Sequence, residues 1–403
     1  MNEVHVVVPG GIDDPRRPSG GNLYDRRVCD GLGALGWSVH EHAAPGRWPN
    51  ADRAARAGVA AALAQMPDDA VVLIDGLVAS VVPEVLQSQA SRLRLVVLVH
   101  MPRDEPKEIG ALSAARAIVA TSQWTRRWLS DNYGLPPGRV HVVAPGADPA
   151  ELVEGTPAGG RLLCVGAVTP IKGHDLLLDA LATVDDVAWG CVLVGALDVD
   201  AAFVEKVRRS TDDRRLSDRV SFAGALTGAD LGVAYAEADV LLLASRAETY
   251  GMVVTEALAR GLPVIATDVG GVREAVGRAA DGSRPGVLVP PEDPHAFALA
   301  VRDWLTDPRL RGRLRAAARS RRQTLVDWPR TSRRLSVVLS EIAGENHPSA
   351  DTPLCRCDPS ATESEALPSA HVSGTGPAWP AARRSSSSSS GGWGLARSWT
   401  GSG

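Results

Sequence analysis

The sequence predicts an α/β protein built from two parallel-sheet domains. Short apolar runs alternate with helix-like segments over most of the chain, a pattern typical of parallel sheets with helices on both faces. A length of 403 residues exceeds that of one ordinary domain. A polar stretch rich in helix and strand breakers, residues 149–160, separates two such alternating halves. We therefore predict a first domain over residues 1–150, a linker over 151–160 and a second domain over 161–327.

The first half opens with an apolar strand at residues 4–8, a long loop rich in glycine and proline, and a helix from about residue 22 to 35. This order is typical of a dinucleotide-type fold. The glycines lack the G-x-G-x-x-G spacing, however, so a nicotinamide oxidoreductase gains little support. Helices are expected at 52–65 and 80–90. Further strands are expected at 38–42, 71–75, 95–100, 117–121 and 140–143.

The second half restarts with a strand at residues 162–165, followed by a loop and a helix that reaches about residue 181. A final helix over 328–343 is expected to follow the second domain. Residues 346–403 are rich in proline, serine and glycine without periodicity, which predicts a disordered low-complexity tail. The remaining strands are expected at 190–194, 220–222, 241–243, 264–266 and 286–291, and further helices at 231–237 and 294–305.

Composition and charge exclude several classes of function. A net charge of -4 and an aromatic content of 4% argue against a nucleic-acid partner. The 5 cysteines have no metal or disulfide spacing, which predicts reduced thiols in a reducing compartment. No stretch approaches the ~20 apolar residues of a membrane span. Because no signal peptide is visible before the first strand, we expect a cytoplasmic protein without a transmembrane segment.

Arginines crowd one helical segment, from Arg309 to Arg334. The simpler interpretation is a solvated basic face. The alternative is peripheral contact with an anionic membrane, which would suit a lipid acceptor.

The stretch over residues 241–276 carries the most chemistry. It is expected to fold as strand, turn, helix, strand, glycine pair and helix. Glu248 lies in the turn and Glu256 in the helix, on the order of 10 Å apart along the axis. Between them, the N–H groups of residues 250–253 lie at a helix N-terminus, a usual place for an anion. The two carboxylates could contact two ends of one ligand; two solvated surface glutamates are the alternative.

This stretch resembles the signature of the retaining GT-B glycosyltransferases of family 4. That family has a loop E-G-F/Y-G, a helix E-A-x-A-x-G-x-P-V and then a glycine pair. The same places here hold residues 248–251, 256–264 and 270–271, with Thr249 instead of the commoner glycine. The resemblance covers about residues 1–343 and implies a GT-B fold, in which two Rossmann-like domains face a central cleft.

The resemblance also implies a role for each matched residue. Glu248 would bind sugar hydroxyls near the reacting carbon, and Glu256 would bind the ribose diol of the donor. Lys172, in a loop similar to G-R-L-x-x-x-K-G, would neutralise the diphosphate. His100, at the end of a predicted strand, would lie near the donor sugar, although a structural histidine is the alternative. The residues expected to bind the donor are Gly20, Gly21, Lys172, Tyr250, Gly251, Met252, Val253 and Glu256.

One departure from the family pattern concerns the charge that opposes the diphosphate. Ala167 stands where the family has an arginine, which leaves Lys172 as the only matched cation. We hypothesise that Arg16, Arg17 or Arg103 supplies the missing charge. No D-x-D motif occurs in the site segments, so no metal is expected.

The sequence therefore predicts a retaining, metal-independent glycosyltransferase that uses a nucleotide-diphosphate sugar. The identity of the nucleotide base, the sugar and the acceptor cannot be derived from the residues. Two alternatives remain open: a catalytically impaired sugar-nucleotide-binding protein, which Ala167 favours, and a sugar-nucleotide epimerase.

Overall fold

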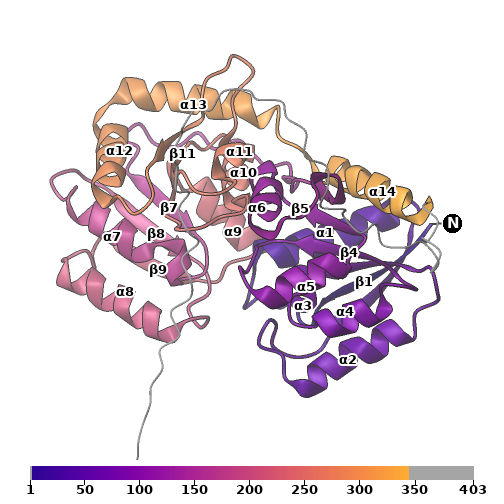
Figure 1. The fold of residues 1–403 in the computed structure, drawn as a ribbon. Coiled ribbons are helices and arrows are strands. Elements are labelled where there is room, and N and C mark those ends of the chain that lie inside the picture. Colours follow the sequence, from indigo (N-terminus) through magenta and orange to yellow (C-terminus); the bar gives the residue numbers. More distant parts are fainter. Residues whose placement is uncertain (1, 345–403) are drawn as a thin grey trace, which may run out of the picture. The chain divides into compact units, whose positions relative to one another are not determined.

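The computed structural model describes residues 2–344 and contains two parallel sheets of six strands each, which confirms the predicted fold class (Figure 1). The first sheet has the order β2-β1-β3-β4-β5-β6 and the second the order β12-β11-β10-β7-β8-β9. The strands are β1 (Glu3–Pro9), β2 (Ser38–Ala44), β3 (Val71–Asp75), β4 (Arg94–Val99), β5 (Ala117–Ala120), β6 (Val140–Val142), β7 (Arg161–Val165), β8 (Gly190–Val194), β9 (Val220–Gly224), β10 (Val240–Leu243), β11 (Val264–Thr267) and β12 (Gly286–Val289).

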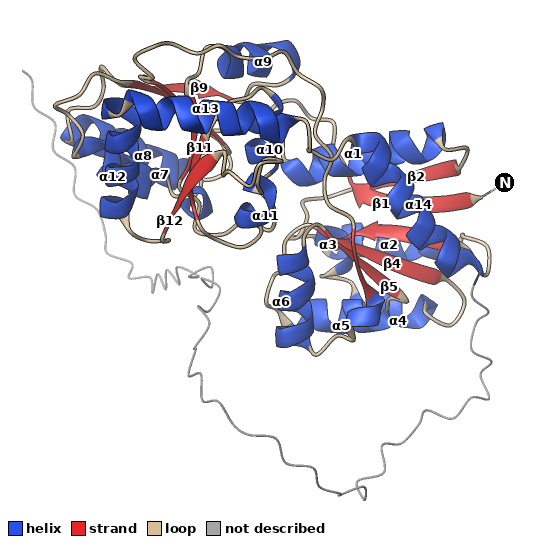
Figure 2. Cartoon of the chain, turned by 90° about the horizontal axis from the view of Figure 1, so that it is seen from above, coloured by secondary structure: helices blue, strands red, loops and turns tan. Residues whose placement is uncertain are grey.

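Helices connect the strands and cover both faces of each sheet (Figure 2). They are α1 (Gly20–Ala34), α2 (Arg53–Ala64), α3 (Gly76–Ala79), α4 (Pro83–Gln89), α5 (Pro106–Ala114), α6 (Gln123–Tyr133), α7 (His174–Ala182), α8 (Ala201–Asp213), α9 (Gly228–Ala236), α10 (Met252–Ala259), α11 (Val272–Val276), α12 (Pro294–Thr306), α13 (Pro308–Arg322) and α14 (Trp328–Gly344), with 3-10 turns η1 (Pro137–Arg139) and η2 (Pro170–Lys172).

Each sheet has one topological switch point. In the first sheet the chain moves outward from β1 to β2 and then in the opposite direction through β3, so the switch lies between β1 and β3. In the second sheet it lies between β7 and β10 for the same reason. Open parallel sheets bind ligands outside the carboxyl ends of the strands at such points. The topology therefore predicts that a ligand binds at the loops that follow β1, β3, β7 and β10.

The last described helix, α14, packs on the first sheet although it follows the second one in sequence. Its apolar side chains Leu335 and Leu339 share a core with Tyr24 and Val28 of α1. Figure 1 shows α14, coloured orange, beside the elements of the first sheet. Trp37 adds a hydrogen bond of 2.9 Å from Nε1 to the hydroxyl of Ser336. The chain thus returns to the first sheet after completing the second.

Several element bounds differ from those predicted. The expected helix at 80–90 is the shorter helix α4, because Pro83 can occupy the first turn of a helix but not its interior. A separate short helix, α3, ends before residue 80 and was not predicted. The arginine-rich segment is likewise divided, between α13 and α14. Helix α1 begins at Gly20, capped by the hydroxyl of Ser19, so both glycines of the predicted donor loop belong to its first turn.

Two further predictions concern the C-terminal tail and the absence of a transmembrane segment. The predicted tail at 346–403, together with Cys355 and Cys357, lies outside the described residues. Within residues 2–344, no helix combines the length and apolar character needed to cross a bilayer.

Candidate sugar-nucleotide site

Lys172 and Glu248 form an ion pair at the switch point of the second sheet. Lys172 ends η2, which follows β7, and Glu248 lies in the loop after β10. The Nζ atom of Lys172 is 2.5 Å from Oε1 of Glu248, and the hydroxyl of Ser245 donates to the same oxygen at 2.9 Å. Glu248 is only 6% exposed, so its carboxylate has a fixed orientation. The two predicted catalytic residues of this half therefore lie together.

The glycine pair at 270–271 shapes the loop that carries Glu248. The N–H of Gly271 donates to the backbone carbonyl of Glu248 at 3.0 Å. A Cβ atom added at Gly270 would lie 1.6 Å from that carbonyl oxygen, and one added at Gly271 would lie 2.0 Å from the carbonyl oxygen of Thr249. Side chains at either position would push the loop away. The glycine pair thus permits the close contact that fixes Glu248.

Helix α10 begins directly after this loop. Gly251 precedes it with φ +89°, a left-handed conformation that suits glycine. Among the described residues, nothing accepts a hydrogen bond from the N–H groups of Met252 and Val253. Tyr250 is buried below the loop. The start of α10 therefore presents two backbone donors at the same end of the sheet as Lys172.

Glu256 lies farther along α10 and is held by a residue that the sequence did not reveal. The hydroxyl of Tyr235, from α9, donates to its Oε2 at 2.8 Å. The guanidinium of Arg260 stacks 4.5 Å from the Tyr235 ring centroid and donates to the backbone carbonyl of Glu256 at 2.9 Å. Burial raises the pKa of Glu256, while the Tyr235 hydrogen bond and Arg260 oppose that rise. Oε1 of the carboxylate has no hydrogen-bond partner among residues 2–344.

In the first half, Gly20, Gly21 and His100 lie together at the switch point between β1 and β3. A Cβ atom added at Gly21 would lie 3.2 Å from Cδ2 of His100, and one added at Gly20 would lie 3.2 Å from Sδ of Met252. Met252 belongs to the second half, so these glycines allow the start of α1 to approach both His100 and α10. Four predicted residues are thus neighbours.

Two buried aspartates, which the sequence interpretation did not single out, contact His100. Nε2 of His100 is 2.8 Å from Oδ1 of Asp25 and 3.4 Å from Oδ2 of Asp75. Asp75 ends β3 just as His100 follows β4, so a search of strand ends would have found it. Asp25 lies within α1 and gives no such signal. These are the one set of three histidine, cysteine or acidic residues within residues 2–344 whose donor atoms cluster within 4.8 Å.

Contacts between the two halves occur at the same site. The hydroxyl of Thr249 donates to the backbone carbonyl of His100 at 2.5 Å. Glu274 of α11 accepts from the N–H groups of Gln123 and Trp124, at 2.8 and 2.6 Å, and so caps the start of α6. The residue that replaces the family's loop glycine, Thr249, therefore joins the Glu248 loop to His100.

The three arginines proposed to replace the missing charge all have carboxylate partners. Arg16 pairs with Asp14 at 2.8 Å, Arg103 with Glu105 at 2.7 Å, and Arg17 with Asp198 of the second half at 3.5 Å. Arg17 is the one of the three that reaches across to the second half. Lys172 is thus the one basic side chain that directly contacts Glu248 among the described residues.

The arginine-rich segment also makes many contacts within the protein. Arg311 is buried and donates to the carbonyl groups of Trp304 and Leu305. Arg315 donates to Asp239, and Arg319 to Glu154. These arginines stabilise the packing of α13, which favours a structural role over a membrane contact.

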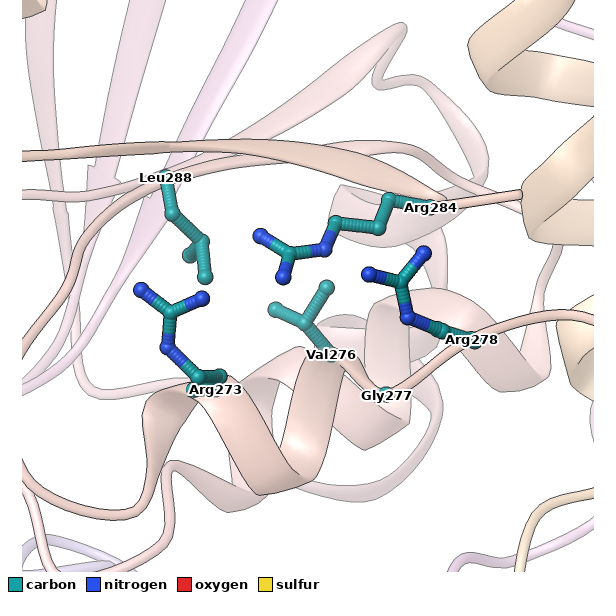
Figure 3. Close-up of a pocket in the computed structure, with 6 residues that line it drawn as sticks. All are labelled: Arg273, Val276, Gly277, Arg278, Arg284 and Leu288. Atoms are coloured by element: carbon teal, nitrogen blue, oxygen red, sulfur yellow. The ribbon is translucent and has the colours of Figure 1, made fainter. Parts of the chain in front are cut away.

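A separate pocket of about 250 Å³ lies beside α11 and β12. Figure 3 shows the guanidinium groups of Arg273, Arg278 and Arg284 around the side chains of Val276 and Leu288. Arg273 pairs with Asp268, and Arg278 donates to the carbonyl of Gly282. None of the predicted site residues lines this pocket.

This chain has two parallel sheets, and predicted donor residues lie at the switch point of each. Both features fit the GT-B class of proteins. Comparison with known families agrees: residues 2–151 match the model "Glycosyltransferase Family 4" and residues 158–321 the model "Glycosyl transferases group 1". The chain belongs to the group 1 glycosyltransferase family, and its two sheets fit the GT-B class.

Similar proteins and structures carry related names. A D-inositol 3-phosphate glycosyltransferase of Kineococcus radiotolerans is 34% identical over 53% of this chain and 54% of its own length. The corresponding protein of Geodermatophilus obscurus is 32% identical over 63% of this chain and 60% of its own. This chain thus spans about half the length of the curated relatives it matches. A sucrose-phosphate synthase from Thermosynechococcus elongatus has a TM-score of 0.70 at 21% identity, covering 85% of this chain and 99% of that structure. An Anabaena protein in complex with UDP-glucose has a TM-score of 0.67 at 17% identity, covering 85% and 100%.

Proposed function

We propose that this protein transfers a sugar from a nucleotide-diphosphate sugar to an acceptor hydroxyl, with retention of configuration and without a metal ion. The observation that carries the proposal is the Lys172 and Glu248 ion pair at the switch point of the second sheet, next to the free N–H groups that begin α10. A cation and backbone donors at this place suit a diphosphate.

Two glutamates and the glycine pair of α1 also have roles in this proposal. Glu256, oriented by Tyr235, would accept hydrogen bonds from the two ribose hydroxyls. The backbone at Gly20 and Gly21 would approach the diphosphate, since side chains there would meet Met252 and His100. Glu248 would accept from hydroxyls of the sugar.

The proposed reaction breaks the bond between the anomeric carbon and the diphosphate oxygen, and the electron pair stays with the diphosphate. The acceptor oxygen bonds to the anomeric carbon from the face that the diphosphate leaves. The acceptor proton passes to an oxygen of the departing diphosphate. Lys172 and the N–H groups of α10 stabilise the negative charge that develops there, and no protein nucleophile is required.

The relatives suggest which substrates to test first. Several similar structures contain UDP or UDP-glucose, and the curated relatives are named for D-inositol 3-phosphate. We propose uridine diphosphate sugars as the first donors and a phosphorylated polyol as the first acceptor.

A thermal-shift panel tests donor binding. Wild type and Glu256→Ala are heated with UDP, GDP, ADP and dTDP and with their sugar conjugates. A ligand at 100 times its dissociation constant stabilises the fold by ~2.7 kcal/mol. We expect one nucleotide series to stabilise wild type, with little effect on Glu256→Ala. Glu237→Ala, which truncates an exposed glutamate in the same way, is the matched control and should respond as wild type does.

Two other outcomes would change the proposal. If no nucleotide shifts the melting temperature of wild type, sugar-nucleotide binding is wrong. If a nucleotide binds but no donor is hydrolysed or transferred, the protein is the impaired binder that Ala167 suggests.

A further inference from the structure

Three side chains from three elements meet at the switch point of the first sheet. Asp75 ends β3, His100 follows β4, and Asp25 lies in α1. Asp25 and Asp75 are 2% and 3% exposed, whereas His100 keeps 15% of its side-chain surface exposed. The carboxylates are therefore inside and the imidazole is the member that a ligand can reach.

The hydrogen bonds determine which imidazole nitrogen carries a proton. Oδ1 of Asp25, at 2.8 Å, is the nearer acceptor, so Nε2 carries the N–H. Burial and the neighbouring Asp25 raise the pKa of Asp75 to about 7, so Asp75 is the acid of this pair that can hold a proton near neutral pH. Among the described residues, Nδ1 has no hydrogen-bond partner. The ring edge at Cδ2 faces Gly21, so Nδ1 lies on the opposite edge. Nδ1 is thus the atom of His100 left for a substrate.

The surroundings fix the orientation of the ring. The Tyr24 ring lies edge-on with a centroid separation of 5.3 Å, and its hydroxyl is bonded to the carbonyl of Val143 at 3.0 Å. The Thr249 hydroxyl holds the backbone carbonyl of His100 from the second half. His100 is therefore oriented by α1 through its ring and by the Glu248 loop through its backbone.

The burial of Asp25 is energetically unfavourable for one of its two carboxylate oxygens. Its Oδ2 atom is buried and has no hydrogen-bond partner among the described residues. A buried acceptor without a hydrogen-bond partner destabilises a fold. Asp75, in contrast, also accepts from the N–H groups of Leu77 and Val78, so it caps α3. Asp25 therefore has two side-chain neighbours, His100 and the carboxyl group of Asp75.

We propose that Asp25 is a positioning residue for glycosyl transfer: it holds His100 through Nε2–H, so that Nδ1 is directed at an oxygen of the bound sugar donor. The inference rests on the proposed function and deepens it. The two carboxylates raise the pKa of His100 against the opposing effect of burial. Nδ1 therefore carries a proton over a wider range of pH and donates to the donor oxygen. Asp25 and Asp75 are the charged groups that act on the ring, and Tyr24 adds only its aromatic edge.

Asp25→Asn tests the role with the shape of the side chain kept. Its amide oxygen can still accept from Nε2–H, but the negative charge is gone. We expect kcat/KM at pH 8 to fall by about 10- to 100-fold, the equivalent of one hydrogen bond to a charged group. We also expect the alkaline limb of the kcat/KM profile to move to lower pH. Asp30→Asn, on the exposed side of the same helix, is the control and should leave both unchanged.

A double variant shows whether Asp25 acts through His100. If it does, Asp25→Asn combined with His100→Ala should be no slower than His100→Ala alone, within about twofold. Additive losses would overturn the proposal and indicate that Asp25 supports the fold. A pH profile that does not move in Asp25→Asn would overturn it as well.

A spectroscopic measurement on wild type does not depend on turnover or on the folding of Asp25→Asn. Long-range ¹H–¹⁵N spectra of histidine-labelled protein, with His100 assigned from His100→Gln, should show the Nε2–H form and a pKa above that of the exposed histidines. Above the pKa of His100, a neutral ring with its one proton on Nδ1 and none on Nε2 would overturn the inference. Stoichiometric zinc uptake by wild type that Asp25→Asn loses would also overturn it, in favour of another role for the cluster. If wild type transfers no sugar but His100 has the expected spectrum, the proposed function fails and the Asp25 contact stands.

Discussion

At the scale of single residues, the proposed reaction relies on Lys172 for the positive charge that would oppose the diphosphate. Ala167 cannot contribute, and Arg16, Arg17 and Arg103 are each paired with a carboxylate. Lys172 itself is bonded to Glu248, so a bound diphosphate would compete with that carboxylate for the ammonium group. The ion pair holds Lys172 in place before the donor arrives.

Removal of this ammonium should therefore affect turnover more than binding. We expect Lys172→Ala to reduce kcat by about 10²- to 10³-fold, as the loss of one preorganised donor to a developing negative charge does. Lys206→Ala removes a lysine whose contact with Asp175 is long, at 3.5 Å, and serves as the control. Steady-state kinetics with the donor found in the thermal-shift panel measure both. A change confined to KM would mean that Lys172 binds the ground state only.

Some site residues were predictable because their signals are local. Glu248, Glu256 and Lys172 occur in short motifs whose spacing survives in one sequence, and these residues lie at one switch point. Tyr235 and Asp25 act through side-chain contacts with residues distant in sequence, 21 positions away for Tyr235 and 75 for Asp25. No periodicity or motif encodes such a contact, so the structure was needed to find them.

At the scale of elements, the strands were predicted more accurately than the helices. A strand buried on both faces, such as β3, is a continuous apolar run with a distinct end. The helices are short, and proline altered their limits: Pro83 starts α4 within an expected longer helix, and Pro106 starts α5, which was not predicted. Local composition gives the class of these elements but not where packing ends them.

The contact between α1 and α14 depends on one glycine. A Cβ atom added at Gly31 would lie 2.0 Å from Oγ of Ser332, so α14 would have to shift. We expect Gly31→Ala to lower the free energy of unfolding by about 1–3 kcal/mol, the cost of overpacking. Gly33→Ala on the same helix meets nothing within 4 Å and should stabilise slightly, by up to about 1 kcal/mol.

Urea denaturation of both variants measures the difference. Ser332→Gly should restore part of the stability of Gly31→Ala, because it removes the atoms in conflict. Equal midpoints for Gly31→Ala and Gly33→Ala would show that α14 does not pack closely on α1.

At the scale of the whole described chain, the site is assembled from both sheets. The second sheet supplies Lys172, Glu248 and Glu256, and the first supplies the glycines of α1 and His100. Contacts of Thr249, Glu274 and Arg17 with the opposite half hold these groups near one another. Because Thr249 and Glu274 flank the glycine pair that shapes the Glu248 loop, contact between the halves and the geometry of the donor loop depend on the same segment.

Glu274 offers the most direct test of this dependence. Its carboxylate accepts from two N–H groups at the start of α6, so Glu274→Gln keeps one acceptor oxygen but loses the charge that favours a helix N-terminus. We expect donor affinity to fall by about 3- to 30-fold, equivalent to the ~0.5–2 kcal/mol of a lost cap. Isothermal titration with the donor measures the affinity, and Glu237→Gln is the control. Unchanged affinity in Glu274→Gln would mean that the second sheet binds the donor without help from the first. A loss of affinity would mean that donor binding by the second sheet requires its contact with the first sheet. Glu274 would then affect the donor although it contacts α6 of the first half.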